Sequence, residues 1–393
     1  MSASAPRVAL LLATVGDLSG SGGTERQFSD LFEFLRRTTP ATIHLVTARA
    51  AVRRLRHAGR AGADERIIAL PLGAHPGQGK LGIAWMTLLL LWQTLLHRWD
   101  VVHICQPTPS YVPYTALLTR WPKALRPNVA LTVVDCTLAP NLSAGARPAD
   151  IYEQQVIDAH AMYFKWARLD GIYSWYQAFA ELARTLRLSP GSRIAAAKYC
   201  FTDPQRFQPG EKRPLVIYAG RLSNQKRPLL FVDAVARLHR DHPAQAAGWQ
   251  FAMYGAGPLE AAVRARIAGH GLTDRLSLTS TPDMAPVFAA SRLFVSTQAH
   301  ENFTSLAMLE AMAAGNAVIA ERVGQSGEFV KARDNGYLVS PATPEAFADA
   351  MADYIGSPAA HDRMAAASRA LAVDVHNIEH FAADIAAFWQ SLR

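Results

Sequence analysis

The stretch of sequence that decides the fold runs from residue 300 to residue 320 and reads HENFTSLAMLEAMAAGNAVIA. Its Thr-Ser pair can cap a helix that Gly315 ends, and residues 317–320 then read as a short buried strand. A helix that is apolar on nearly every side is expected to be buried. Glu310 is the one charged residue between Glu301 and Glu321. A buried carboxylate needs hydrogen-bond donors, and a ligand rich in hydroxyl groups would supply them.

Strand and helix signals alternate on both sides of this stretch, which indicates doubly wound parallel sheets. Helical patterns, such as 25–37 and 228–238, separate apolar runs that are typical of buried parallel strands. A segment rich in proline and charge, residues 207–214, is typical of a linker. The predicted strands are 7–13, 42–47, 67–70, 100–104 and 129–134 before the linker, and 215–218, 250–253, 276–278, 293–295 and 317–320 after it.

The chain of 393 residues is therefore expected to be an α/β protein with two Rossmann-like domains. We assign residues 1–210 to the first domain and residues 211–379 to the second. Residues 380–393 are expected to form a helix that packs back on the first domain. Ligands of such sheets bind beyond the carboxyl ends of the strands, so a cleft between two facing domains is the expected site.

Composition narrows the class of protein. The three cysteines, Cys105, Cys136 and Cys200, have no paired spacing, so we expect free thiols in a reducing cytoplasm. No secretory signal pattern is visible, which also favours the cytoplasm. The formal charge is +8, and residues 1–210 hold 23 Lys and Arg against 14 Asp and Glu. The arginines between residues 49 and 66 could form a solvated helix face, dock on anionic lipid or attract an acidic acceptor; no motif supports nucleic acid.

Residues 81–96 read LGIAWMTLLLLWQTLL and raise the question of a membrane. The run is shorter than the roughly 20 residues that a helix needs to span a bilayer. We expect a core-packing helix, with a helix that lies on a membrane surface as the alternative. Either a membrane-proximal or a purely cytoplasmic location is compatible with this segment.

Residues 218–228 read YAGRLSNQKRP and join the first strand of the second domain to its helix. Arg221 and Lys226 then lie at a strand end and a helix entrance, where backbone N–H groups already favour an anion. A guanidinium fork and an ammonium group suit a diphosphate. A surface salt-bridge pair is the alternative interpretation.

Three glycine-rich turns accompany this loop. Gly255 and Gly257 follow a predicted strand but lack the third glycine of a dinucleotide fingerprint, so a dehydrogenase is disfavoured. Gly22 and Gly23 form a similar loop before the first helix. Glu328, after the turn that begins at Gly324, could contact a sugar or cap a helix.

The order of these motifs resembles the retaining glycosyltransferases of family 4. The resemblance is specific over about residues 215–345 and looser before them. It is carried by GRL at 220–222 with Lys226, GAGP at 255–258, Glu301 followed by EAMAAG at 310–315, GE at 327–328 and NGYLV at 335–339.

The resemblance implies a GT-B fold and a nucleotide-sugar donor held by the second domain. Arg221 and Lys226 resemble the diphosphate ligands, Glu310 the ribose ligand and Glu301 the contact to the transferred sugar. We assign catalysis to Arg221, Lys226 and Glu301. The donor-binding set is Gly22, Gly23, Gly255, Gly257, Asn302, Phe303, Thr304, Ser305, Glu310 and Glu328.

Two departures from the family pattern matter. Eight residues separate Glu301 from Glu310, where the family usually has seven, so the extra residue falls in the loop at residues 302–305. Val134 stands where many members have a histidine before an aspartate. Asp135 or His103 could substitute for that histidine, although a structural role is the stronger expectation for His103.

The resemblance further implies a metal-independent, hexosyltransferase-like enzyme without a cofactor, of the kind used for cell-envelope polysaccharide. The chain contains no Asp-x-Asp pair for a metal. The acceptor could be a glycan, a lipid-linked molecule or a small molecule, with peripheral membrane contact through the basic first half. Another GT-B enzyme, such as an epimerase or a phosphorylase, and a non-catalytic sugar-nucleotide-binding protein stay open as alternatives.

Overall fold

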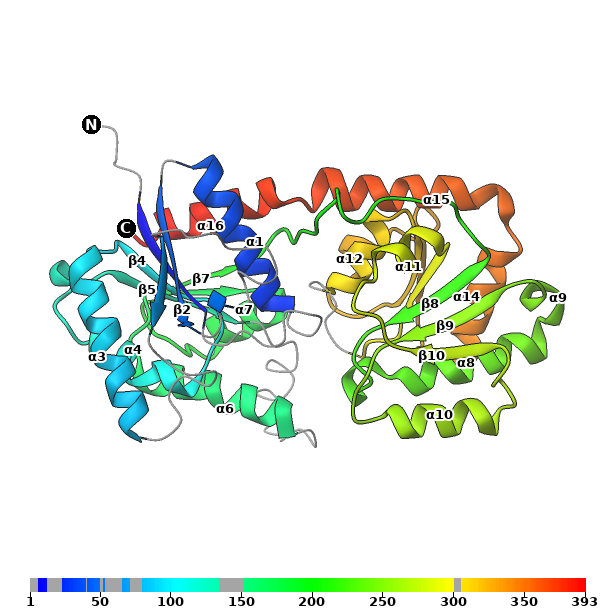
Figure 1. The fold of residues 1–393 in the computed structure, drawn as a ribbon, viewed down its shortest axis with the longest axis horizontal. Helices are drawn as coiled ribbons and strands as arrows, with labels where there is room; N and C mark the ends of the chain where they lie inside the picture. Colours follow the sequence, from blue (N-terminus) through cyan, green and yellow to red (C-terminus); the bar gives the residue numbers. More distant parts are fainter. Residues whose placement is uncertain are drawn as a thin grey trace. The chain divides into compact units, whose positions relative to one another are not determined.

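The computed structural model divides the chain into two units, each built on one parallel sheet (Figure 1). The first unit comprises Met1–Lys198 and Ile378–Arg393, and the second comprises Tyr199–Asn377. The predicted linker at residues 207–214 thus falls inside the second unit. The residues described are 6–12, 23–39, 41–49, 52–53, 66–70, 80–133, 151–299 and 305–393, with 23–26, 48 and 151–157 described by their backbone alone.

The sheet of the first unit has seven described strands in the order β3-β2-β1-β4-β5-β6-β7, all parallel. His103 in β4 pairs in register with Leu10 of β1 and Ala130 of β5. The order reverses between β1 and β4, as in a doubly wound sheet. The strands are β1 (Arg7–Leu11), β2 (Thr42–Ala48), β3 (Ile67–Leu70), β4 (Val101–Ile104), β5 (Asn128–Val133), β6 (Gly171–Ser174) and β7 (Arg193–Ala196).

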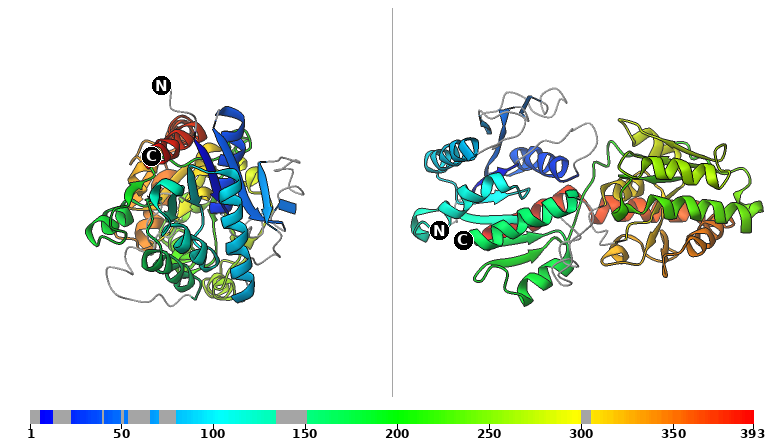
Figure 2. Two further views of the ribbon diagram at one scale, coloured as in Figure 1. Left: turned by 90° about the vertical axis from the view of Figure 1, so that its left-hand side faces the viewer. Right: turned by 90° about the horizontal axis from the view of Figure 1, so that it is seen from below.

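Helices cover both faces of this sheet (Figures 1 and 2). Helices α1 (Gly23–Thr38) and α16 (Ile378–Gln390) pack together on one face. On the other face α4 lies between α3 and α6. The helices of that face are α3 (Lys80–His97), α4 (Val112–Leu118), α6 (Ile151–Trp166) and α7 (Gln177–Thr185), with short 3-10 turns at Pro109–Tyr111 and Lys123–Leu125.

Helix α3 is a core-packing helix on one side only. Met86 and Leu90 are wholly buried, whereas Trp85 and Trp92 are exposed. The expectation of a core-packing helix is therefore right for its inner face and wrong for its outer face. In the described ranges no helix is both long and apolar enough to cross a membrane.

Helix α16 ties the end of the chain to the first sheet. Trp389 donates its indole N–H to Nδ1 of His103 at 2.7 Å, and Nε2 of His103 lies 2.5 Å from Oγ1 of Thr132. Tyr173 donates its hydroxyl to Asp384 of the same helix at 2.7 Å. Burial lowers the pKa of His103 to about 3, so its ring is neutral. Because Nδ1 accepts the indole N–H of Trp389, Nε2 carries the proton. Both ring nitrogens are engaged inside the core, which makes His103 a structural residue.

We expect His103 to make the first unit less stable in acid. Its folded-state pKa of about 3 lies below the ordinary value of 6.5, so between them only the unfolded chain holds the proton. Its contribution is full above pH 6.5 and falls by about 1.4 kcal/mol per pH unit as the pH drops toward 3. Urea unfolding from about pH 7 to about pH 4.5 should show a shallower loss for His103→Gln. The exposed His380→Gln is the control, and equal slopes for His103→Gln and wild type would contradict the expectation.

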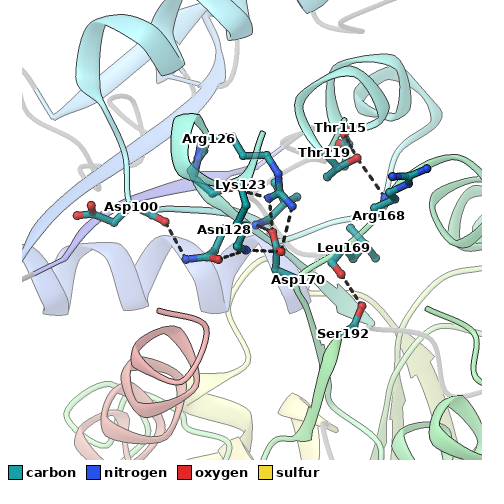
Figure 3. Close-up of polar contacts among 12 residues, drawn as sticks. Asp100, Thr115, Thr119, Lys123, Arg126, Asn128, Arg168, Leu169, Asp170 and Ser192 are labelled. Atoms are coloured by element: carbon teal, nitrogen blue, oxygen red, sulfur yellow. Dashed lines mark hydrogen bonds and ion pairs between the residues drawn. The ribbon is translucent and has the colours of Figure 1, made fainter. Parts of the chain in front are cut away.

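The amino edge of the same sheet is held by Asp170, which immediately precedes β6 (Figure 3). Its carboxylate accepts hydrogen bonds from Arg126, Lys123 and the backbone N–H of Val129. Burial alone would raise the pKa of Asp170, but the hydrogen bonds from Arg126 and Lys123 outweigh it and the pKa is lowered. This cluster joins the starts of β5 and β6. It lies at the amino edge of the sheet, opposite the carboxyl edge where ligands of such sheets bind.

The sheet of the second unit has six described strands in the order β10-β9-β8-β11-β12-β13, again all parallel. Its hydrophobic core brings together strand residues such as Val216 and Ile319 with Phe231 and Phe347 of the flanking helices. The strands are β8 (Leu215–Ala219), β9 (Gln250–Tyr254), β10 (Leu276–Thr279), β11 (Leu293–Ser296), β12 (Ala317–Glu321) and β13 (Gly336–Val339). The helices are α8 (Pro228–Asp241), α9 (Pro243–Ala246), α10 (Glu260–Gly269), α11 (Ala285–Ala290), α12 (Leu306–Ala313), α13 (Ser326–Phe329), α14 (Pro344–Ile355) and α15 (Pro358–Ala370), followed by a π-helical turn at Leu371–Val375.

Candidate functional site

The candidate site is the carboxyl edge of the second sheet. Strands β9, β8, β11 and β12 are neighbours, so the loops that follow them meet at this edge. The loop after β8 carries Arg221 and Lys226, and the loop after β9 carries Gly255 and Gly257. The structure thus brings these four predicted residues to one edge.

The loops after β8 and β9 are joined by their backbones. Gly220 donates its N–H to the carbonyl of Tyr254, and Leu222 donates to Ala256, both at 3.0 Å. A Cβ atom at Gly255 would lie 2.0 Å from the carbonyl oxygen of Gly220, and one at Gly257 would lie 2.6 Å from that of Leu222. Both glycines therefore permit the close approach that holds the Arg221 loop in place.

We expect Gly255→Ala to destabilise the second unit and to displace the Arg221 loop. The new methyl group would overlap a backbone oxygen that cannot move aside, and overpacking of this kind costs about 1–3 kcal/mol. Urea unfolding and calorimetric titration with nucleoside diphosphates would measure both effects. Gly269→Ala is the control, because nothing lies within 4 Å of its Cβ position. Equal stability and binding in the two variants would contradict the packing role of Gly255.

Lys226 is held by the loop that follows β11. It ends a 3-10 turn, Asn224–Lys226, and its Nζ donates to Oε1 of Gln298. The hydroxyl of Thr297 donates to the carbonyls of Lys226 and Arg227 at 2.8 and 2.9 Å. The backbone on either side of Lys226 is thereby fixed, and its ammonium group has a defined position at the edge.

Arg227 also fixes this loop. The sequence did not predict its role. Its φ of 44° places a non-glycine residue in the left-handed region, which commonly costs about 1–3 kcal/mol. Its Nε donates to the carbonyl of Thr297 at 2.8 Å, and its Nη2 pairs with the carboxylate of Glu321 at the end of β12. Arg227 therefore joins the carboxyl ends of three strands. The available signal was a basic residue directly before the helix-starting Pro228.

Ser305 immediately precedes helix α12 of the second unit, and Glu310 lies within this helix. Ser305 is the N-cap residue but its side chain makes no capping hydrogen bond. Glu310 is 5% exposed, which confirms that the carboxylate is buried. At the other end of the helix, Lys212 donates to the carbonyl of Ala314 at 2.7 Å, and Arg369 donates to that of Ala313. Two basic side chains that donate to the last carbonyls of the helix therefore fix the position of α12.

The other predicted residues fall into two groups. Glu328 lies on α13 with 62% of its side chain exposed, 3.8 Å from Lys331, and Gly23 is the first residue of α1 in the first unit. The predictions for Gly22, Glu301, Asn302, Phe303 and Thr304 fall outside the described residues. Within the described ranges no three His, Cys, Asp or Glu side chains could hold a metal ion together.

The first unit holds two further polar groups that the sequence did not reveal. Gln27 in α1 is 2% exposed, and neither atom of its amide has a hydrogen-bond partner in the described part of the chain. The indole N–H of Trp175, just beyond the carboxyl end of β6, is likewise buried without a described partner. Their shared neighbour is Phe28, whose ring stacks on Trp175 and which follows Gln27 in sequence. Buried polar groups without a partner are uncommon in folded proteins.

Residues 213–357 match the family described as "Glycosyl transferases group 1". The matched residues include β8–β13 and α12, and therefore the whole edge described above. Curated relatives and solved structures are similar to this chain over longer stretches than these residues.

Among curated relatives, the chain is 30% identical over 215 residues to the lipopolysaccharide core biosynthesis mannosyltransferase LpcC of Rhizobium leguminosarum bv. viciae. The match covers 51% of this chain and 59% of that protein. The chain spans between 40% and 59% of the length of the first three curated relatives that it matches.

Solved structures match almost the whole chain. The sucrose-phosphate synthase of Thermosynechococcus elongatus has a TM-score of 0.73 at 17% identity, covering 98% of this chain and 99% of that one. Anabaena HepE in complex with UDP-glucose has a TM-score of 0.72 at 16% identity, covering 98% and 100%. The predicted fold class, two Rossmann-like parallel-sheet domains of the GT-B type, is confirmed.

Proposed function

We propose that this protein is a retaining glycosyltransferase that moves a sugar from a nucleotide-sugar donor to a glycan or lipid-linked acceptor without a metal ion. The observation that carries the proposal is the position of Lys226, held between the ends of β8 and β11 beside the Arg221 loop. The family match over residues 213–357 and the names of the relatives support the same class of reaction.

In the proposed reaction the bond between the anomeric carbon and the diphosphate oxygen breaks while negative charge grows on the diphosphate. Arg221, Lys226 and the amino end of α12 would stabilise that charge, as fixed positive groups do for developing anions. The acceptor oxygen forms its bond on the face that the diphosphate leaves, and a phosphate oxygen takes the acceptor's proton. The configuration at the anomeric carbon is then retained without a nucleophile from the protein.

The roles of the carboxylates follow from the motif resemblance and the burial of α12. Glu310, inside the second unit, would accept hydrogen bonds from the donor ribose, and Glu301 would contact the transferred sugar. An acceptor of the lipopolysaccharide or polysaccharide kind is supported by the name of LpcC, and a UDP-sugar donor by the UDP-glucose bound to HepE.

A thermal-shift screen of nucleoside diphosphates and their sugars tests this proposal. A donor that binds the folded state raises the melting temperature, by an amount that grows with its concentration above Kd. The matching sugar nucleotide should then release its nucleoside diphosphate only when an acceptor glycan is present. Release of an epimer without acceptor, or binding without any turnover, would instead support the epimerase or the non-catalytic alternative.

A further inference from the structure

The outer face of α3 is the most apolar exposed surface among the described helices. Eight residues of this helix are exposed and seven of them are apolar, Lys80 being the exception. The large ones are between 54% and 88% exposed: Leu81, Trp85, Leu88, Trp92, Leu95 and Leu96. Contiguous apolar surface of this kind commonly marks an interaction site.

The exposed side chains form a stripe along a firmly anchored helix. At 3.6 residues per turn, the six large residues fall within a sector about 100° wide. The buried residues Met86, Leu90 and Thr94 lie on the opposite side. Thr94 shares a hydrogen bond of 2.7 Å with Tyr114 of α4, so the hydroxyl group of Thr94 on the inner face has a partner within the unit. A helix of 18 residues is about 27 Å long, which makes the stripe a ridge along one side of the first unit.

The charged residues that follow this ridge in sequence are mostly positive. Between residues 80 and 133 the chain contains five Lys and Arg but a single acid, Asp100, and two of the five cations, Lys123 and Arg126, pair with Asp170. Asp100 accepts the backbone N–H of Arg7 at 2.8 Å and lies 3.5 Å from its guanidinium, so its charge is compensated. Lys80 begins the helix and Arg98 directly follows it. A cation therefore stands at each end of the apolar stripe.

We propose that the outer face of α3 docks on the surface of a bilayer that contains anionic phospholipids. Leucine and tryptophan side chains enter the boundary between headgroups and acyl chains, where tryptophan is favoured, and Lys80 and Arg98 pair with lipid phosphates. A second copy of the chain fits this face less well. In a two-fold pair of antiparallel helices, Lys80 of each copy would meet Arg98 of the other, and like charges would repel. Lipid binding by this face does not depend on the reaction proposed above.

Vesicle flotation of the full chain tests the proposal. We expect wild type to float with phosphatidylcholine vesicles that contain about one-third phosphatidylglycerol and to bind pure phosphatidylcholine at least about tenfold more weakly. Trp85→Gln with Trp92→Gln should lower the partition coefficient at least about tenfold, since both rings leave the interface. Lys80→Gln with Arg98→Gln should remove the preference for anionic vesicles.

Leu186→Gln is the matched control, because Leu186 is an exposed apolar residue elsewhere in the first unit, and it should bind vesicles as wild type does. All variants should keep the melting temperature of wild type and its shift with nucleoside diphosphate, which separates this test from that of the reaction. Absent or lipid-independent flotation of wild type, or equal binding by the tryptophan variant, would overturn the proposal. A dimer in light scattering that the tryptophan variant dissociates would overturn it in favour of a second copy.

Discussion

Replacing Lys226 by Ala should lower turnover by roughly 10²–10³-fold while changing donor affinity far less. The ammonium group is fixed by Gln298 and by the Thr297 hydroxyl on its backbone, so its charge is in place before the diphosphate begins to leave. A fixed charge contributes most in the transition state, where the negative charge on the leaving group is greatest. Steady-state rates with varied donor, together with calorimetric binding of the nucleoside diphosphate, would separate the two effects.

Lys331→Ala is the control for this experiment. Lys331 is a half-exposed lysine of the second unit that pairs with Glu328 at 3.8 Å. Its removal should leave turnover within about twofold of wild type, as for most surface substitutions. A Lys226→Ala enzyme with unchanged turnover would show that this lysine takes no part in stabilising the leaving group.

The second large effect is expected for Glu310→Gln, which should weaken binding of the donor by roughly 10–100-fold. Hydrogen bonds to a charged group contribute about 1.5–3 kcal/mol, and the amide keeps the shape of the side chain but not its charge. Because a nucleoside diphosphate carries the ribose but not the transferred sugar, its affinity should fall as much as that of the full donor. Calorimetry with both ligands would measure the two affinities.

Glu301→Gln provides the comparison. If Glu301 contacts the transferred sugar, this variant should bind the nucleoside diphosphate as wild type does and lose affinity or rate only with the full donor. A Glu310→Gln protein that binds the bare nucleoside diphosphate normally would contradict the ribose assignment. Its folding stability should be measured in parallel, since the side chain it alters is buried.

The sequence predicted strands at the centre of each sheet and also the edge strands β3 and β10. Runs such as 215–218 and 317–320 are continuous, apolar and rich in β-branched residues, and they became β8 and β12. Strands β6, β7 and β13 were missed as strands. Each has only four residues, two of them begin with glycine and β7 is an edge strand. Their pairing with neighbouring strands outweighs weak local propensity, which no single window of sequence reveals.

The site likewise contains residues that the sequence predicted and residues that it did not. Arg221 and Lys226 could be predicted because a strand, a turn and a helix place them at a known edge within a few residues. The contacts of Arg227 could not be predicted, because its partners Thr297 and Glu321 are 70 and 94 residues away in sequence. The role of Gly255 in letting the Arg221 loop approach could not be predicted either. A strand followed by glycine has the same sequence pattern whether a ligand or another loop packs against the glycine.

The hydrogen bond between Trp389 and His103 has a consequence for biosynthesis. It joins residues 286 positions apart, and the whole second unit lies between them in the chain. A ribosome therefore releases all of the second unit before the residues that cover β4 emerge. The second unit can close its core during synthesis, whereas the first unit waits with an open face until α16 is free. The first unit begins to be made earlier and is nevertheless completed after the second.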